Sequence, residues 1–169
     1  MKALFDRVSV RCSRITTHAY STSFSLGIRC LEKDLRDPIY SIYGFVRFAD
    51  EIVDTFHEFD KKSLLERFKE ETYQSIREGI SLNPILNSFQ FTVNRFNIEN
   101  SLIEQFLKSM EMDLAKNSYD ASSFKEYILG SAEVVGLMCL RVFCKGDKVM
   151  FENLKPYAMR LGYDFKKIN

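Results

Sequence analysis

The chain has 169 residues, of which 46% are hydrophobic and 14% aromatic, and 24 basic against 23 acidic residues give a net charge near +1. This length supports one domain with a substantial core, and the balanced charge argues against nucleic acid as a partner. Four cysteines without zinc spacing and only two histidines argue against a soft-metal site. Met1 to Ser25 lacks the apolar core of a signal peptide, and no apolar run approaches the roughly 18 residues of a membrane span. We therefore expect a cytoplasmic protein, with peripheral membrane association left open.

Apolar residues at helical spacing predict an all-α chain. In chain order, the first helix covers about residues 2–19, and the polar residues 21–25 form a break. The second helix begins at Asp34 or Asp37, carries Pro38 in its first turn and ends near Phe56. The remaining predicted helices run from Asp60 to Arg77 with Gly79 as C-cap, from Asn83-Pro84 to about Arg95, from Asn100 or Ser101 to about Asn117, from Asp120 or Ser122 to about Phe143, and from Phe151 to Asn169.

The chain shows no linker, repeat or low-complexity tract, so residues 1–169 are predicted to form a single helical domain. Residues 161–169 carry no closing cap signal for the last helix. We therefore expect the domain to be incomplete at its C-terminus. A bundle cut there exposes an apolar face over residues 134–165, which predicts that the chain self-associates, pairs with a missing segment or is poorly soluble.

One stripe of the second predicted helix carries polar side chains inside an otherwise apolar segment. Tyr43, Arg47, Asp50 and Asp54 follow at i, i+4, i+7 and i+11 and fall on one side of the helix. Two carboxylates one turn apart suit a hard cation such as Mg²⁺, and the arginine suits a phosphate. The alternative is a solvated polar stripe in which Arg47 and Asp50 form an ion pair.

Other polar residues carry similar alternatives. Asp113 projects from an apolar helix face, either satisfied by a neighbouring helix end or arginine, or lining the same cavity as Asp50. The hydroxyls of residues 21–23 either cap a helix or donate to phosphate oxygens. The small residues of the segment 130–136 admit close helix packing or a long apolar ligand.

Four blocks of the sequence, taken together, resemble the squalene/phytoene synthase family. They are residues 20–25 (YSTSFS), residues 42–54 (IYGFVRFADEIVD), residues 110–114 (MEMDL) followed by Tyr119, and residues 127–136 leading to Arg141-Val142-Phe143. The phytoene branch is the closer one. The resemblance implies the N-terminal part of an isoprenoid-synthase-type helical bundle, with an apolar cavity between helices.

The resemblance also implies a chemistry and a set of site residues. The family condenses two prenyl diphosphates head to head, here geranylgeranyl diphosphate to phytoene, with Mg²⁺ or alternatively Mn²⁺ as cofactor. It implies catalytic roles for Tyr43, Arg47, Asp50, Asp54 and Asp113, with the metal held by Asp50 and Asp54. The residues that it implies for substrate binding are Ser21, Ser23, Phe24, Val135, Gly136 and Asn169.

The family's second aspartate-rich motif is missing from these 169 residues, and Lys166 stands where the family has a glutamine. Two hypotheses follow. The first is a transferase represented by most of its first half, and we expect the chain alone to form no phytoene. The second is a non-catalytic or degenerate module of the same fold that binds a prenyl lipid or a partner protein. The sequence does not separate farnesyl from geranylgeranyl substrates.

Overall fold

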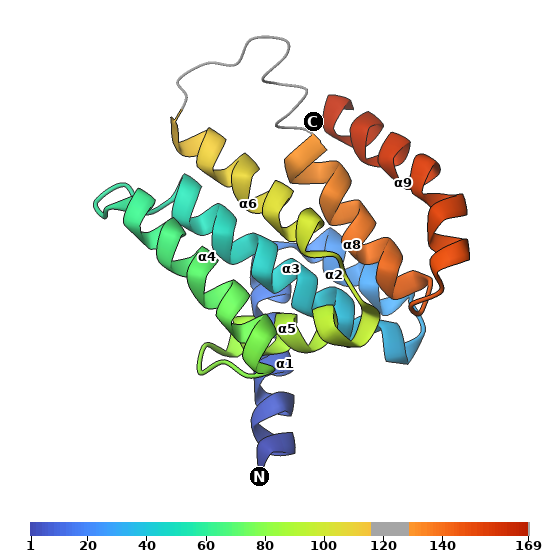
Figure 1. Ribbon diagram of the computed structural model, residues 1–169, viewed down its shortest axis with the longest axis horizontal. Helices are drawn as coiled ribbons and strands as arrows, with labels where there is room; N and C mark the ends of the chain where they lie inside the picture. The colour runs from blue at the N-terminus through green and yellow to red at the C-terminus, as the bar shows by residue number, and fades with distance from the viewer. Residues whose placement is uncertain (116–128, 169) are drawn as a thin grey trace.

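The computed structural model describes the backbone of residues 1–115 and 129–168, and side chains as far as Ala115 and from Ser131 to Arg160. Every element within these residues is helical, and they contain no strand (Figure 1), which confirms the all-α prediction. None of the described helices is both long enough and apolar enough to cross a bilayer. The elements are α1 (Lys2–Tyr20), α2 (Thr22–Arg29), α3 (Lys33–Asp54), α4 (Lys61–Glu78), α5 (Pro84–Phe96), α6 (Asn100–Ala115), the π-helical turn η1 (Leu129–Glu133), α8 (Val134–Phe143) and α9 (Lys148–Ile168).

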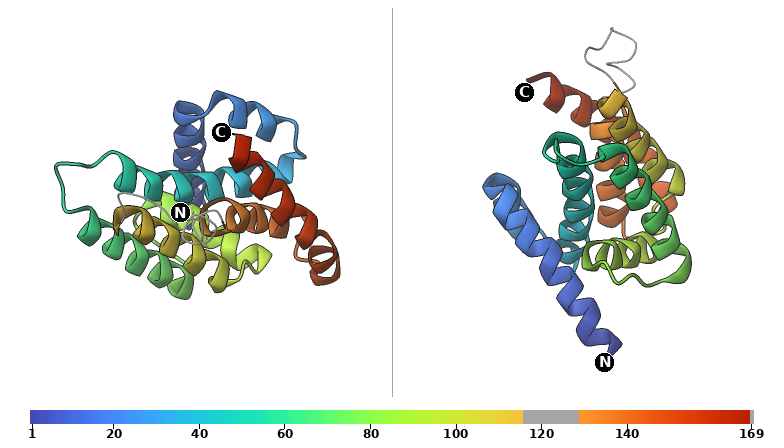
Figure 2. Two further views of the ribbon diagram at one scale, coloured as in Figure 1. Left: turned by 90° about the horizontal axis from the view of Figure 1, so that it is seen from above. Right: turned by 90° about the vertical axis from the view of Figure 1, so that its left-hand side faces the viewer.

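Helix α3 is the centre of the bundle. It contacts α1, α2, α4, α5, α6 and α8, and seen from above it separates α1 and α2 from α4 and α6 (Figure 2). Its Phe45 is fully buried and stacks on Phe89 of α5 with ring centroids 3.9 Å apart. Phe68 of α4 and Phe106 of α6 close the cluster at 5.5 and 5.4 Å from Phe45. Aromatic burial of this kind is a large hydrophobic contribution, and it fixes which face of α3 points inward.

Helix α1 packs on the bundle through small hydroxyl side chains rather than large apolar ones. Ser9, Ser13 and Thr17 are completely buried, and Ser13 shares a 2.6 Å hydrogen bond with Ser88 of α5. On α3 the facing residue is Gly44, where a Cβ would lie 2.9 Å from the Ser13 hydroxyl oxygen. The absence of a side chain at Gly44 therefore permits the close approach of α1 and α3.

The predicted ends of α4 and the predicted start of α5 are confirmed. The Asp60 side chain accepts a hydrogen bond from the Ser63 amide at 3.1 Å, and Gly79 ends α4 in the left-handed conformation with φ +69°. Asn83 caps α5, with Pro84 as its first residue. Local cap chemistry is sufficient to place these boundaries.

The predicted polar break over residues 21–25 is wrong, because only Ser21 leaves the helical conformation. Its φ of −149° bends the chain between α1 and α2, and its side chain accepts a hydrogen bond from the Phe24 amide at 3.2 Å. Ser25 continues α2 since its buried hydroxyl donates to the carbonyl of Ser21 at 2.6 Å. Ser21 therefore acts as a cap, as the capping alternative predicted for it.

The predicted start of the second helix is also wrong. Helix α3 begins at Lys33, so Pro38 is the sixth residue of the helix and not part of its first turn. Pro38 deprives the carbonyl of Asp34 of its helical partner, but Asp34 lies on an exposed first turn where water is available. Burial of Leu35, which is 8% exposed, anchors that additional turn.

The sixth predicted helix ends at Phe143 as predicted, whereas the last one starts earlier than predicted. Helix α9 begins at Lys148 instead of Phe151 because the Asp147 side chain accepts a hydrogen bond from the Met150 amide at 3.0 Å. Helix α8 is preceded by the π-helical turn η1. The predicted end of the fifth helix at Asn117 and the predicted start of the sixth lie outside the described residues.

Candidate active site

The polar stripe predicted from the sequence lies on the C-terminal half of α3. Tyr43, Arg47 and Asp50 are partly buried, and Asp54 is exposed as the last residue of the helix. The stripe keeps its register because Ala49, in the same stretch of α3, is completely buried in the core. Asp50 is close enough to influence the charge state of both Tyr43 and Arg47. The structure thus brings three of the four predicted residues into one electrostatic group, with the fourth one turn beyond.

Asp54 occupies a position that gives the helix no electrostatic benefit. The carbonyl end of a helix carries partial negative charge, and a carboxylate there is unfavourable. The Lys61 ammonium donates to the carbonyl of Val53 at 2.6 Å, so this end already attracts a cation. An added cation held by Asp54 would be favoured by the same helix end, which distinguishes this residue from an ordinary surface aspartate.

Arg47 pairs with Glu51 rather than with Asp50. Its Nε lies 3.1 Å from a Glu51 carboxylate oxygen, its Nη2 contacts the same oxygen, and its guanidinium lies 4.5 Å from the centroid of the Tyr20 ring. The ion pair between Arg47 and Asp50 in the solvated-stripe alternative is therefore replaced by an i, i+4 pair. The Arg47 hydrogen bond holds the pKa of Glu51 below its usual value. Partial burial acts to lower the pKa of Arg47, but its bond to Glu51 and the nearby carboxylates leave that pKa raised.

Helix α2 and its N-cap Ser21 supply an aromatic and a hydroxyl partner for Tyr43. The Phe24 ring stacks on the Tyr43 ring with centroids 5.0 Å apart and an interplanar angle of 29°. Burial raises the pKa of Tyr43, and the Ser21 hydroxyl and the Arg47 charge only partly offset this effect. Tyr43 therefore remains a protonated hydroxyl, able to donate a hydrogen bond to an anion, through the neutral and mildly alkaline range.

The other predicted site residues lie on different elements. Ser23 is exposed on α2, and Asp113 is partly buried on α6, which packs on α3. Whether Asp113 opens onto the same cavity as Asp50 stays a prediction. Val135 and Gly136 are partly buried on α8, and a Cβ at Gly136 would meet the Ala158 carbonyl only at 3.9 Å. Because 3.9 Å is an ordinary van der Waals distance, the packing of α9 on α8 does not require a glycine at position 136. Asn169, the last predicted site residue, lies outside the described residues.

Two further residues, Glu51 and Tyr20, belong to the site although the sequence analysis assigned them no role. Glu51 was detectable, because it follows Arg47 at the i, i+4 spacing of helical ion pairs. Tyr20 was not detectable from local pattern, since it meets Arg47 through the packing of α1 on α3.

The donor set of the stripe fits a hard divalent cation. Asp50 and Asp54 offer carboxylate oxygens, and Mg²⁺ is commonly held by one or two carboxylates together with waters and substrate phosphates. Within the described residues, no cluster of three or more His, Cys, Asp or Glu side chains could hold a metal by itself. The pair on α3 therefore fits a cation that a phosphate-bearing ligand helps to bind, and it does not fit an all-protein metal cage.

Comparison with known proteins identifies the family to which the chain belongs. The sequence profile of squalene/phytoene synthases matches residues 17–169. The chain belongs to the squalene/phytoene synthase family. Among its relatives, a phytoene synthase of Arthrospira platensis is 30% identical over 134 residues, which is 78% of this chain and 42% of the relative. Phytoene synthase 3 of Zea mays is 30% identical over 168 residues, which is 96% of this chain and 38% of that protein.

Solved structures of the family share the fold. A dehydrosqualene synthase superposes with a TM-score of 0.79 at 19% identity, covering 93% of this chain and 53% of that one. A squalene synthase of Alicyclobacillus acidocaldarius gives a TM-score of 0.78 at 24% identity, covering 91% and 58%. The fold is therefore that of the isoprenoid synthases, as predicted. The chain spans less than two thirds of the length of these family members.

Proposed function

We propose that the chain forms the first aspartate-rich part of a head-to-head prenyl synthase. In this proposal, two molecules of geranylgeranyl diphosphate condense to phytoene. The observation that carries the proposal is the stripe on α3, where Arg47, Asp50 and Asp54 follow Tyr43 along one helix face and the Tyr43 ring stacks on Phe24 of α2. Membership of the family supports the reaction class. The substrate chain length and the role of each residue are our inference.

Each group of the stripe has a role in binding the diphosphate. Asp50 and Asp54 would hold Mg²⁺, which neutralises charge on the departing diphosphate. Glu51 accepts from the Nε–H and from one N–H of Nη2, so both Nη1 donors and the second Nη2 donor of Arg47 remain for a phosphate oxygen. Tyr43 keeps its proton and would donate a further hydrogen bond from the neighbouring turn of α3.

The same groups favour cleavage of the allylic C–O bond. Departure of the diphosphate would leave a carbocation on the prenyl chain, which the double bond of the second prenyl diphosphate attacks. The positive charge passes to the second chain, and loss of a proton there closes the cyclopropyl ring of the intermediate. Phe24 and Tyr43 place aromatic faces beside the site, where they can stabilise the cation and exclude water. Asp113 is proposed to line the same space from α6.

Calorimetry with a geranylgeranyl thiodiphosphate, which resists ionisation, tests the site separately from turnover. We expect Mg²⁺-dependent binding to the wild-type chain, and a loss of about tenfold or more in Asp50→Asn or Asp54→Asn. The matched control is Glu70→Gln, which removes one exposed carboxylate from α4 and leaves binding unchanged. Equal Mg²⁺-dependent affinity in all variants would remove these carboxylates from the proposal, and tighter binding of the farnesyl analogue would reassign the substrate.

A further inference from the structure

The outward face of α1 exposes large apolar side chains that the proposed reaction does not use. Leu4, Val8 and Ile15 are 58%, 45% and 68% exposed. Their spacing places them within an arc of about 40° on the helix surface. This arc lies opposite the completely buried Ser9, Ser13 and Thr17, so it is the side of α1 that points away from the bundle.

Three arginines run beside this apolar stripe. Arg7, Arg11 and Arg14 fall within an arc of about 60° next to it, and they line a groove of about 360 Å³ between α1 and α5. Arg14 pairs with Asp37 at 2.5 Å. Among the described residues, no carboxylate lies within ion-pair distance of Arg7 or Arg11. At least two guanidinium charges therefore remain for an external anion.

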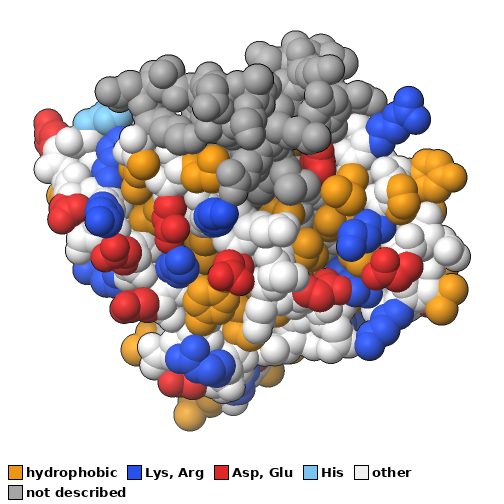
Figure 3. Space-filling model, turned by 45° about the horizontal axis from the view of Figure 1, so that its top comes forward, with side chains coloured by type: hydrophobic (Ala, Val, Ile, Leu, Met, Phe, Trp, Pro, Cys, Tyr) orange, Lys and Arg blue, Asp and Glu red, His pale blue; other side chains and the backbone are white. Residues whose placement is uncertain are grey.

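Two carboxylates, Asp6 and Asp37, also line this groove, but both pair with basic side chains of the protein. The one acidic residue of α1, Asp6, turns toward the bundle, where Lys2 and Asn87 both donate to it. Elsewhere the surface differs, since in the view of Figure 3 basic and acidic side chains are interspersed. Helix α1 is also the outermost helix on its side, and its N-terminal end projects beyond the other helices (Figure 2).

We propose that the outward face of α1 docks on the surface of a membrane that contains anionic phospholipids. Leu4, Val8 and Ile15 would enter the boundary between headgroups and acyl chains, while Arg7 and Arg11 contact phosphates. This arrangement of an apolar stripe beside a basic one is typical of interfacial helices. The apolar stripe itself lies on a convex helix surface, with the groove to one side of it, which favours a planar lipid surface over a helical peptide partner. The inference does not depend on the proposed function.

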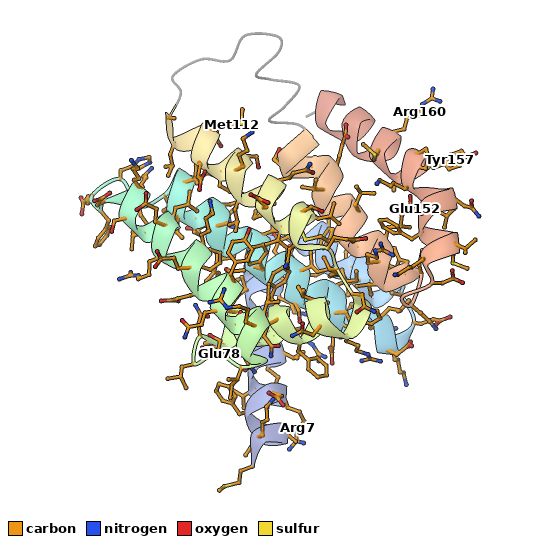
Figure 4. All side chains as sticks on the ribbon, in the orientation of Figure 1. Arg7, Glu78, Met112, Glu152, Tyr157 and Arg160 are labelled. Atoms are coloured by element: carbon orange, nitrogen blue, oxygen red, sulfur yellow. The ribbon has the colours of Figure 1, made fainter. Side chains whose placement is uncertain are left out.

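The absence of tryptophan from the chain permits a sharp test, because one introduced tryptophan reports its own environment. Leu4→Trp places the probe in the stripe. Tyr157→Trp is the matched control, since Tyr157 is 73% exposed on α9 and lies far from Arg7 (Figure 4). We expect vesicles of phosphatidylcholine with phosphatidylserine to blue-shift the emission of Leu4→Trp, and brominated acyl chains to quench it. The Tyr157→Trp emission stays unchanged.

Charge variants separate lipid binding from nonspecific adsorption. Arg7→Gln with Arg11→Gln is expected to weaken vesicle binding in a sedimentation assay by about tenfold or more. The control, Lys62→Gln with Arg77→Gln, removes the same charge from exposed positions of α4, on the other side of α3 (Figure 2), and leaves binding unchanged. Raised salt weakens wild-type binding because it screens the phosphates. Circular dichroism verifies that each variant keeps its helices.

Three results would overturn the proposal. The first is no vesicle binding by the wild-type chain. The second is a shift of the Tyr157→Trp emission without one for Leu4→Trp, which would assign membrane contact to α9. The third is an oligomer in light scattering that Leu4→Ser with Ile15→Ser converts to a monomer, because the face would then belong to a second copy of the chain.

Discussion

Replacing Asp54 by asparagine is expected to stabilise the fold while it removes ligand binding. Asp54 is the last residue of α3 and is exposed, and the described residues place no ion pair on it. Its carboxylate therefore faces the negative end of the helix dipole, and a charge at a helix end is worth about 0.3–1 kcal/mol. For a chain of this size, such a gain corresponds to roughly 1–4 °C in Tm.

The assay is thermal unfolding at low ionic strength with and without Mg²⁺ and the thiodiphosphate analogue. Without ligand, Asp54→Asn should melt above wild type, and with ligand the order should reverse because only wild type gains from binding. Glu78→Gln is the control. Glu78 is the last residue of its own helix, α4, and lies at the opposite end of that helix from Lys61, which contacts Val53 beside Asp54. Its gain is smaller, because Gln74 donates to Glu78 at 2.9 Å, and its ligand response is unchanged. A lower Tm of ligand-free Asp54→Asn would refute the argument, since it would show that the carboxylate serves the fold.

Three further predictions concern packing and pH. Arg141, whose side chain is 7% exposed, forms an ion pair with Glu99. Glu99→Gln should lower the free energy of unfolding in urea by about 3 kcal/mol, because it leaves the buried guanidinium without its charge partner. The loss should exceed that of Arg141→Met, which removes the buried charge itself. Equal losses would contradict this asymmetry. Gly44→Ala should cost about 1–3 kcal/mol in the same assay, since the new Cβ meets the buried serine hydroxyl of α1 at 2.9 Å, and an unchanged midpoint would show that α1 shifts freely. Glu51→Gln should destabilise the fold at neutral pH. Because Arg47 lowers the pKa of Glu51, this contribution is present above the usual carboxyl pKa and is lost as pH falls through the lowered value, so a difference from wild type that persists in strong acid would refute it.

Local sequence was sufficient where one cap residue determines a helix end. Asp60, Gly79 and Asn83 each meet the chemical requirement of their position, and the structure places them as predicted. It was insufficient at Pro38, because burial of Leu35 in the tertiary structure extends α3 by a turn that proline alone would not begin. Propensity is overridden wherever the core supplies more free energy than the local signal.

At the candidate site, too, some features were predictable from the sequence and others depended on the tertiary structure. The stripe from Tyr43 to Asp54 follows from helical periodicity and was predictable residue by residue. The choice of partners for Arg47 was not, since Tyr20 meets it through the packing of α1 on α3, and Glu51 and Asp50 both lie within helical ion-pair spacing of the same guanidinium. Periodicity determines which residues share a face, but the choice among neighbours on that face depends on side-chain geometry.

The hydroxyl-lined contact of α1 has a consequence for how the molecule opens. Ser9, Ser13 and Thr17 bury little apolar area, whereas Phe45 and Phe89 join α3 to α5 through stacked rings. Helix α1 should therefore separate from the bundle as a unit at a lower free energy than global unfolding. Its amide protons would exchange with deuterium before those of α3, and the chain would pass through a native-like state in which the aromatic cluster is intact and α1 is detached.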